Sequence, residues 1–191
     1  MNRKVALLCL LNTLGAGVGC RLSAPDPKGP RLEVAWAGSD TATFSAPATA
    51  EWCDSLRMLE IRALGSDTGV SLIVYPVGPV GPGRYPVRVP EGADTARPSS
   101  AVGLRWFAAN LVRGFQGNSG AVLLRKASEG TVSGEFDAAA GSVTDDRRLT
   151  LRGSFHGLRI RAAERGCVSR VSTADTAAAA TADTGSAAEV D

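Results

Sequence analysis

The chain has a single histidine, His156, so any histidine-based catalysis would depend on that residue alone. A serine–histidine–acid triad would need His156 as its general base. The sequence offers no Gly-x-Ser-x-Gly turn that would present the nucleophile. We interpret His156 as an exposed strand residue, and we expect that the protein is not an enzyme.

Acidic residues offer two further kinds of chemistry. Asp145 and Asp146, with Asp137 nearby, could supply the oxygen ligands that calcium prefers, but a polar hairpin loop explains the pair more simply. Two carboxylates meeting across strands could hydrolyse a glycosidic bond, and Glu60, Glu135 and Asp137 are candidates. Nothing in the sequence selects a pair among them. We therefore expect no metal site, no cofactor and no catalytic residues.

The first twenty residues have the pattern of an export signal. A short basic start, with Arg3 and Lys4, precedes an apolar run at 5–14, which is too short to span a bilayer, and then a mostly small-residue stretch at 15–19. Cys20 follows at once, as in a bacterial lipoprotein signal, although Gly17 stands where that motif usually has Leu. We expect export, cleavage after residue 19 and attachment to a membrane of the cell envelope through lipid on Cys20. Simple secretion is the alternative.

The remaining cysteines indicate a disulfide. Cys9 leaves with the signal and Cys20 carries the lipid, which leaves Cys53 and Cys167 as a pair in an oxidising compartment. In the chain-entropy model, closing so long a loop stabilises the fold by roughly 4 to 5 kcal/mol. Two unpaired buried thiols are the alternative.

Exposed aromatic side chains could form a binding face, because aromatic residues are scarce here, at 5%. If Cys53 points into the core, its neighbour Trp52 points outward. If Trp106 points inward, Phe107 points outward. Trp52, Phe107 and Tyr85 could then stack against a sugar or a partner protein, unless loops or a second sheet cover them.

Strand patterns must position these residues, and apolar and polar residues alternate through most of the chain. Residues 59–63 and 70–75 predict a hairpin, with a turn at 65–69. Residues 84–89 predict an edge strand, since Pro86 cannot donate to a ladder. Further strands are predicted at residues 31–36 and 102–106.

The last third of the domain predicts a meander of three strands at residues 122–126, 131–138 and 147–161. In the third strand, the alternation of apolar and polar residues shifts by one position at Gly157–Leu158. This shift predicts a bulge there, after which Leu158 and Ile160 point inward.

About nine strands and no convincing helix predict an all-β fold. We expect an antiparallel β-sandwich, with a closed antiparallel β-barrel as the alternative. The single domain should cover residues 31–167, after a Pro-rich extended tether at 20–30. Residues 168–191 are mostly Ala, Thr, Ser and Asp and predict a disordered tail, with a frayed Ala-rich helix as the alternative.

Charge excludes nucleic acid as the main partner. Without Arg3 and Lys4, which leave with the signal, the chain from Cys20 onward has 19 basic and 19 acidic residues. A neutral chain lacks the positive field that attracts a polyanion.

Four short segments resemble recurring pieces of uncharacterised bacterial lipoproteins with β-sandwich domains: Thr43-Phe44-Ser45-Ala46, Pro82-Gly83-Arg84-Tyr85-Pro86-Val87, Gly130-Thr131-Val132-Ser133-Gly134-Glu135-Phe136 and Leu151-Arg152-Gly153-Ser154-Phe155. This resemblance implies a similar fold and a place in the cell envelope, and it supplies no site residues. We expect a binding or structural role in the envelope, with an envelope protein or a glycan as partner. A carbohydrate or small-ligand binding module is the alternative, and an envelope hydrolase the second alternative.

Overall fold

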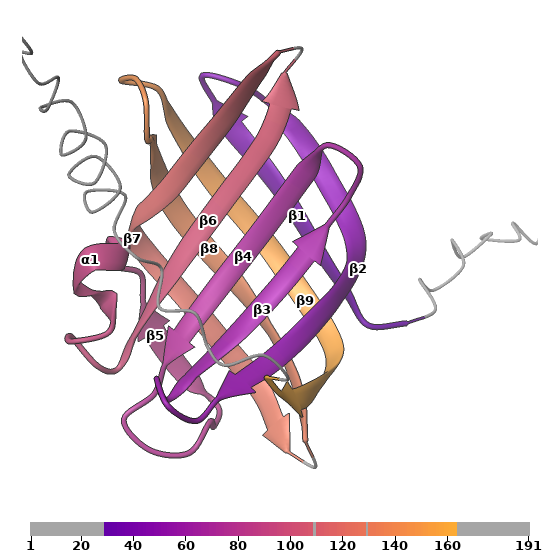
Figure 1. Ribbon diagram of the computed structural model, residues 1–191, viewed down its shortest axis with the longest axis vertical. Coiled ribbons are helices and arrows are strands. Elements are labelled where there is room, and N and C mark those ends of the chain that lie inside the picture. Colours follow the sequence, from indigo (N-terminus) through magenta and orange to yellow (C-terminus); the bar gives the residue numbers. More distant parts are fainter. Residues whose placement is uncertain (1–28, 109, 129, 164–191) are drawn as a thin grey trace, which may run out of the picture.

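A computed structural model describes residues 29–108, 110–128 and 130–163 (Figure 1). Cys20, most of the tether, Cys167 and the tail at 168–191 lie outside these residues. The described elements are β1 (Arg31–Gly38), β2 (Ala42–Cys53), β3 (Met58–Leu64), β4 (Thr68–Tyr75), β5 (Gly83–Pro86), α1 (Pro90–Ala93), β6 (Ser99–Ala108), β7 (Leu111–Ser128), β8 (Thr131–Ser142) and β9 (Arg148–Ala162).

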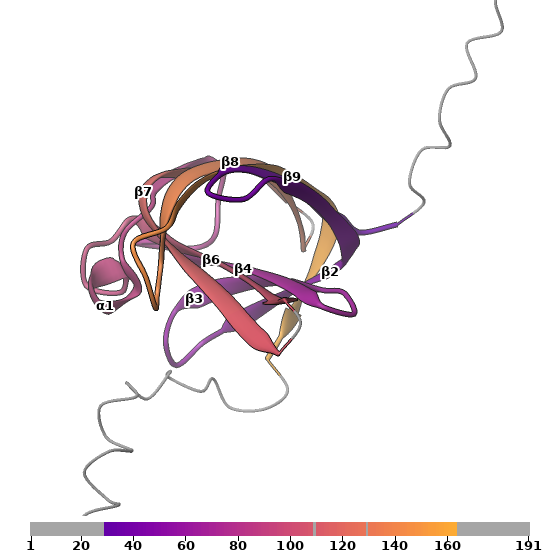
Figure 2. The same cartoon turned by 90° about the horizontal axis from the view of Figure 1, so that it is seen from above.

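Antiparallel strands in the order β7-β6-β4-β3-β2-β1-β9-β8 form one sheet, and pairing of β7 with β8 closes it into an eight-stranded barrel. The prediction of an all-β antiparallel fold is confirmed. The arrangement is the closed barrel given as the alternative, and not two separate sheets. In Figure 2 the barrel is flattened, so that β7, β8 and β9 arch over β6, β4 and β3. Strands that alternate inward and outward residues are expected in a sandwich and in a barrel alike, because each fold buries one face of its sheet and exposes the other.

Two long strands close the barrel by changing neighbours along their length. β7 has 18 residues and pairs with β5, β6 and β8, while β9 has 15 residues and pairs with β8, β1 and β2. β7 begins at Leu111, well before the predicted start at 122. The additional residues at 111–116 pair with β6. The predicted hairpin is present as β3 and β4, and β5 is an edge strand, as expected.

Side chains fill the interior of the barrel. The largest fully buried side chains come from strands all around it: Phe155, Leu32, Leu59, Ile61, Leu72, Leu124, Leu151, Leu158, Val70, Val74, Val102 and Val122. Three rings are stacked inside the end of the barrel that holds the β1–β2, β3–β4 and β6–β7 turns, which we call the upper end after Figure 1. The ring centroids of Trp36 and Trp106 are 5.5 Å apart, and those of Trp106 and Phe115 are 5.1 Å apart. An eight-stranded barrel is just wide enough for inward side chains to fill its interior.

Two glycine–phenylalanine pairs fix the contact between β8 and β9. Gly134 lies opposite Phe155, and Phe136 lies opposite Gly153. A Cβ atom on Gly153 would be 2.5 Å from Cζ of Phe136, and one on Gly134 would be 2.7 Å from Cζ of Phe155. Each ring therefore lies over the glycine of the facing strand, an arrangement that compensates the missing side chain.

The predicted bulge in β9 is confirmed. The register between β8 and β9 shifts between Val132 and Gly134, opposite His156 and Gly157. Gly157 has a φ of 62°, a left-handed conformation that glycine adopts without steric cost. Leu158 is then fully buried and Ile160 packs against the core, as expected from the phase of the sequence.

Candidate ligand site at the lower end of the barrel

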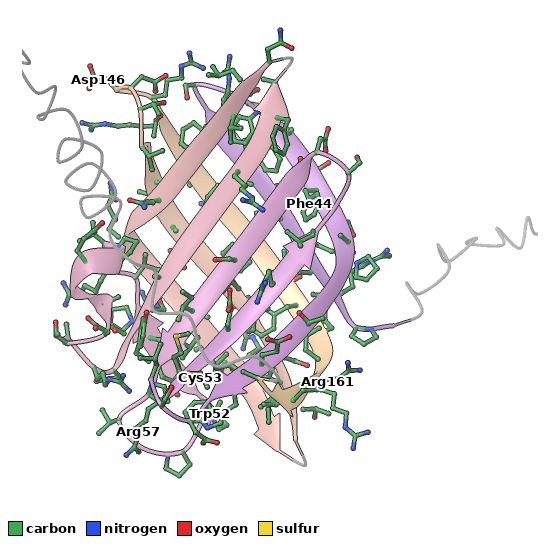
Figure 3. All side chains as sticks on the ribbon, viewed as in Figure 1. Phe44, Trp52, Cys53, Arg57, Asp146 and Arg161 are labelled. Carbon is green, nitrogen blue, oxygen red and sulfur yellow. The ribbon has the colours of Figure 1, made fainter. Side chains whose placement is uncertain are left out.

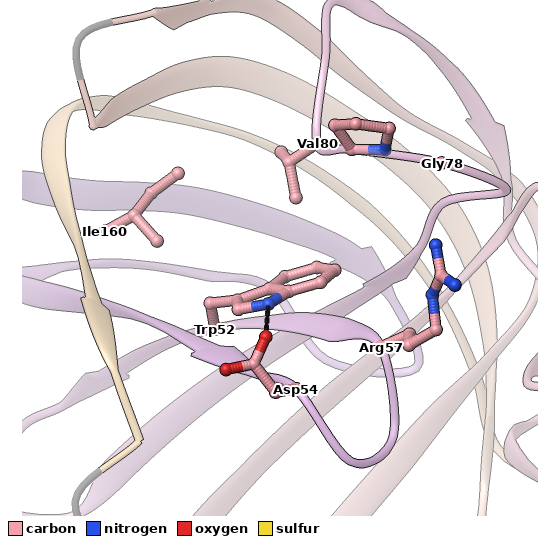
Figure 4. A pocket seen from close by; sticks show the side chains of 7 residues that line it. Trp52, Asp54, Arg57, Gly78, Val80 and Ile160 are labelled. Atoms are coloured by element: carbon pink, nitrogen blue, oxygen red, sulfur yellow. Dashed lines mark hydrogen bonds between the residues drawn. The ribbon is translucent and has the colours of Figure 1, made fainter.

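An open pocket of about 530 Å³ lies at the lower end of the barrel, where β2 turns into β3 (Figures 3 and 4). Its lining comes from the end of β2, the β2–β3 turn, the loop between β4 and β5, and the end of β9: Trp52, Asp54, Arg57, Gly78, Pro79, Val80 and Ile160. Mouths of β-barrels are common places for small-ligand sites.

A change of strand neighbour places Trp52 beside Ile160. β1 begins at Arg31, opposite Pro47 of β2 and His156 of β9. Below that point β9 itself pairs with β2, in parallel, with Ala50 opposite Ile160 and Trp52 opposite Ala162. The backbone N–H of Ala163 donates to the carbonyl of Trp52 over 3.0 Å. The sheet thus narrows at this end, and the inward side chains of β2 and β9 meet.

Trp52 does not point outward as expected. Cys53 is 3% exposed, as predicted, but Trp52 is half-buried and also packs against the core. β2 ends at Cys53 and the chain turns there, so strict alternation does not extend through the last residues of the strand. The indole forms one wall of the pocket, facing Ile160 and Val80 (Figure 4).

Two charged side chains line the pocket together with the indole. Nε1 of Trp52 donates to Oδ1 of Asp54 over 2.6 Å, which fixes the edge of the ring and leaves a face toward the pocket. Arg57 has a φ of 48°, an uncommon value for a non-glycine residue that marks the tight turn. Its exposed side chain lines the same pocket as the indole and has no hydrogen-bond or ion-pair partner among the described residues. The pocket therefore offers one aromatic face, one carboxylate and one guanidinium.

The three predicted aromatic residues do not share one face, and that part of the prediction is wrong. Tyr85 is 6% exposed and its hydroxyl donates to the carbonyl of Gly81 over 3.0 Å. Phe107 is 56% exposed, as predicted, and Trp106 is buried. However, Phe107 is at the upper end of β6, whereas Trp52 is at the lower end of β2. The structure thus places Trp52 alone of the three in the pocket.

The other candidate residues lie on the outer wall. His156 is exposed there. Glu135 accepts a hydrogen bond from Arg125 over 2.5 Å, and Glu60 accepts one from Arg62 over 3.2 Å. Asp137 is exposed on β8, while Glu60 is on β3, so no cleft joins the three carboxylates predicted as hydrolase candidates.

Asp145 and Asp146 lie in the exposed β8–β9 loop, as predicted. A hydrogen bond with the Ser142 side chain and one from the backbone N–H of Arg147, with the nearby Arg147 charge, lower the pKa of Asp145. Within residues 29–108, 110–128 and 130–163, no three His, Cys, Asp or Glu side chains are grouped as metal ligands.

The disulfide stays a prediction, because Cys167 lies outside the described residues. The end of β9, which leads toward Cys167 in the sequence, lies beside Trp52, the residue before Cys53. Only four residues follow Ala163 to reach Cys167, a span of up to about 14 Å when extended. Cys20 is likewise outside the described part. No helix within that part has the length and apolar character needed to cross a membrane.

A second hollow of about 450 Å³ lies on the outer wall over β1, β2 and β9. It is bordered mainly by short or charged outward side chains of these strands, among them Glu33, Thr43, Ser45, Arg152 and Ser154, while its one aromatic residue, Phe44, is half-buried and packs against the core. It lacks the indole face of the lower-end pocket, so we regard the lower-end pocket as the candidate site.

Comparison of the chain with family models, with curated proteins and with solved structures finds no match. The resemblance to envelope lipoproteins stays an expectation. Sequence reasoning singled out Trp52 but missed Asp54, Arg57, Val80 and Ile160. Of these four, only Ile160 was indicated by the sequence, because the alternation after the bulge at Gly157 places it on the inward face. The other three lie in turns or loops, where periodicity carries no information.

Proposed function

We propose that this protein is an exported, lipid-anchored binding protein of the cell envelope, whose barrel binds a saccharide at its lower end. The observation that carries the proposal is the Trp52 indole, held by Asp54 and facing an open pocket. Because side chains fill the barrel, a ligand is expected at its mouth and not in its interior.

The chemistry of the pocket suits a sugar ring. A pyranose has an apolar C–H face that packs on an aromatic ring and hydroxyl groups around its rim that need hydrogen bonds. Trp52, Ile160 and Val80 provide the apolar surface. The carboxylate of Asp54 accepts hydrogen bonds, and the guanidinium of Arg57 donates them.

Binding is a better proposal than hydrolysis. A glycoside hydrolase works with two carboxyl groups flanking the scissile bond. Among the described residues, the lining of this pocket includes one carboxylate, Asp54, which is engaged with the indole. We therefore propose that the ligand leaves the site unchanged.

The location is proposed from the sequence. The export signal at residues 1–19 and the lipid on Cys20 would place the domain at a membrane surface, with burial of acyl chains contributing about 0.8 kcal/mol per methylene. The tether at 20–30 ends where β1 begins, at Arg31. The domain would thus stand close to envelope glycans.

The test is titration of the purified domain with a panel of neutral and N-acetylated mono- to tetrasaccharides, followed by tryptophan fluorescence and calorimetry. We expect at least one saccharide to bind. Trp52→Ala should weaken it by about tenfold, the effect of losing roughly 1.4 kcal/mol. Phe107→Ala is the matched control, because Phe107 is an exposed aromatic residue at the opposite end.

Two results would contradict the proposal. One is a panel in which no saccharide binds the natural protein. The other is a saccharide that binds the Trp52→Ala and Phe107→Ala proteins with equal affinity, because its site would then lie elsewhere.

A further inference from the structure

Arg97 makes the densest set of side-chain hydrogen bonds near the pocket. Its guanidinium donates to four backbone carbonyls: Asp94 at 2.9 Å, Arg57 at 2.8 Å, Pro76 at 3.2 Å and Leu56 at 2.7 Å. These carbonyls belong to three separate segments of the chain. A planar guanidinium with five N–H donors can satisfy several acceptors at once.

A ring supports the guanidinium. The Cζ atom of Arg97 lies 5.4 Å from the ring centroid of Tyr75, the last residue of β4. A cation over an aromatic face is attracted by its quadrupole. The side chain of Arg97 is therefore held both by its donors and by the surface below it.

Two of the three segments carry walls of the pocket. The β2–β3 turn offers the carbonyls of Leu56 and Arg57, and the same turn presents the Asp54 and Arg57 side chains to the pocket. The loop after β4 offers the carbonyl of Pro76 and continues into the lining at 78–80. Arg97 itself is anchored to the third segment through Asp94.

We propose that Arg97 is the positioning residue of the lower-end site, setting the distance between the β2–β3 turn and the β4–β5 loop and so the width of the pocket. The expected effect of Arg97 on saccharide affinity rests on the proposed function. The expected effect of Arg97 on the two loops does not. Arg97 is absent from the pocket lining, so it acts through the loops and not on the ligand.

Lysine is the informative replacement. It keeps the positive charge and a long stem, but its ammonium group is a single point and lacks the fork that reaches carbonyls on different segments. Arg97→Lys should therefore loosen the two loops without removing a buried apolar group. Arg97→Gln is the second variant, which also removes the charge. Arg105→Lys is the matched control, since Arg105 is exposed near the upper end of β6.

Three measurements test the inference on the full domain. The first is amide hydrogen exchange at residues 54–57 and at Val77, Gly78 and Val80, since Pro76 and Pro79 have no backbone N–H. The second is acrylamide quenching of tryptophan fluorescence, which reports mainly on Trp52 because Trp36 and Trp106 are 5% and 9% exposed. The third is affinity for the tightest saccharide of the panel above, measured beside the melting temperature.

We expect both Arg97 variants to exchange faster in the two loops and to show stronger quenching, with saccharide affinity weaker by about tenfold. The Arg105→Lys protein should match the natural one in all three. Unchanged exchange and quenching in folded Arg97→Lys protein would overturn the inference, and so would looser loops with unchanged affinity. If no saccharide binds the natural protein, the proposed function fails, and exchange and quenching alone decide whether Arg97 positions the pocket.

Discussion

At the scale of single residues, short-range polar contacts decide what a side chain offers to solvent. Trp52 is the last large side chain of β2, and its Nε1–H donates to Asp54, two residues further along the chain, over 2.6 Å. That bond satisfies the one donor of the indole and restrains the ring, so its face can be presented to a ligand at little entropic cost.

Asp145 gives a pH-dependent prediction at this scale. Its pKa is lowered in the folded state by the Ser142 hydrogen bond, the Arg147 backbone N–H and the Arg147 charge. The stabilisation is complete above the unfolded pKa, which is about 3.9 for Asp, and is lost as the pH falls through the lower folded pKa. We expect Asp145→Asn to lower the melting temperature slightly at pH 7, with the difference vanishing in acid.

The control is Asp146→Asn, which changes the neighbouring charge in the same exposed loop. Asp146 makes no hydrogen bond or ion pair among the described residues. Equal losses for the two variants at pH 7, or a loss for Asp145→Asn that persists at pH 2, would show that the contacts of Asp145 do not stabilise the loop. Thermal melts at a series of pH values make the comparison.

At the scale of elements, the Gly-x-Phe segments of β8 and β9 pack against each other. Gly134 and Phe136 share the inward face of β8, and Gly153 and Phe155 share that of β9. In antiparallel register each ring lies over the facing glycine. The role of these two segments is therefore packing between the two strands.

Gly153→Ala should therefore destabilise the barrel. The new Cβ would collide with the carbonyl oxygen of Glu33 and would lie 2.5 Å from Cζ of Phe136, so the backbone or the ring must shift. Overpacking of this kind costs roughly 1 to 3 kcal/mol, which urea unfolding will measure. Ser154→Ala, the next residue along, is the control and should change little. A Gly153→Ala protein as stable as the control would mean that β8 and β9 adjust freely.

At the scale of the whole molecule, β9 joins three other strands. It pairs with β8 and β1 along the barrel, and its end then pairs with β2. This brings the chain leaving the domain beside Cys53, as the predicted bond to Cys167 requires. The bond would lie next to the pocket wall formed by Trp52.

The intact mass of the mature protein, purified from its own membrane fraction, tests the anchor and the disulfide together. We expect the mass of the chain from Cys20 with acyl groups added and two hydrogens removed. Reduction should restore the two hydrogens in the natural protein and not in Cys53→Ser. An unlipidated mass that begins at another residue would contradict the anchor, and a mass unchanged by reduction would contradict the disulfide.

The sequence by itself predicted most of the strands, many of their inward faces and the bulge at Gly157. It did not predict β2, Ala42–Cys53, the strand that carries Trp52. Alternation with a period of two is a local consequence of burying one face of a sheet, so it can be read from neighbouring residues. The exposure of Phe107 and His156 followed from the same pattern. The pattern did not reveal the early start of β7, where Gly114, Gly117 and Gly120 interrupt the apolar alternation.

Only the tertiary structure decided between sandwich and barrel and placed the site. Closure depends on which distant strands pair, and the pairing of the first strand, β1, with the last, β9, leaves no separate mark on the alternation. The pocket joins Trp52, Val80 and Ile160, which come from distant parts of the chain. They meet because β1 begins midway along β2 and leaves room for the end of β9. That geometry arises from the barrel as a whole, so no local sequence pattern encodes it.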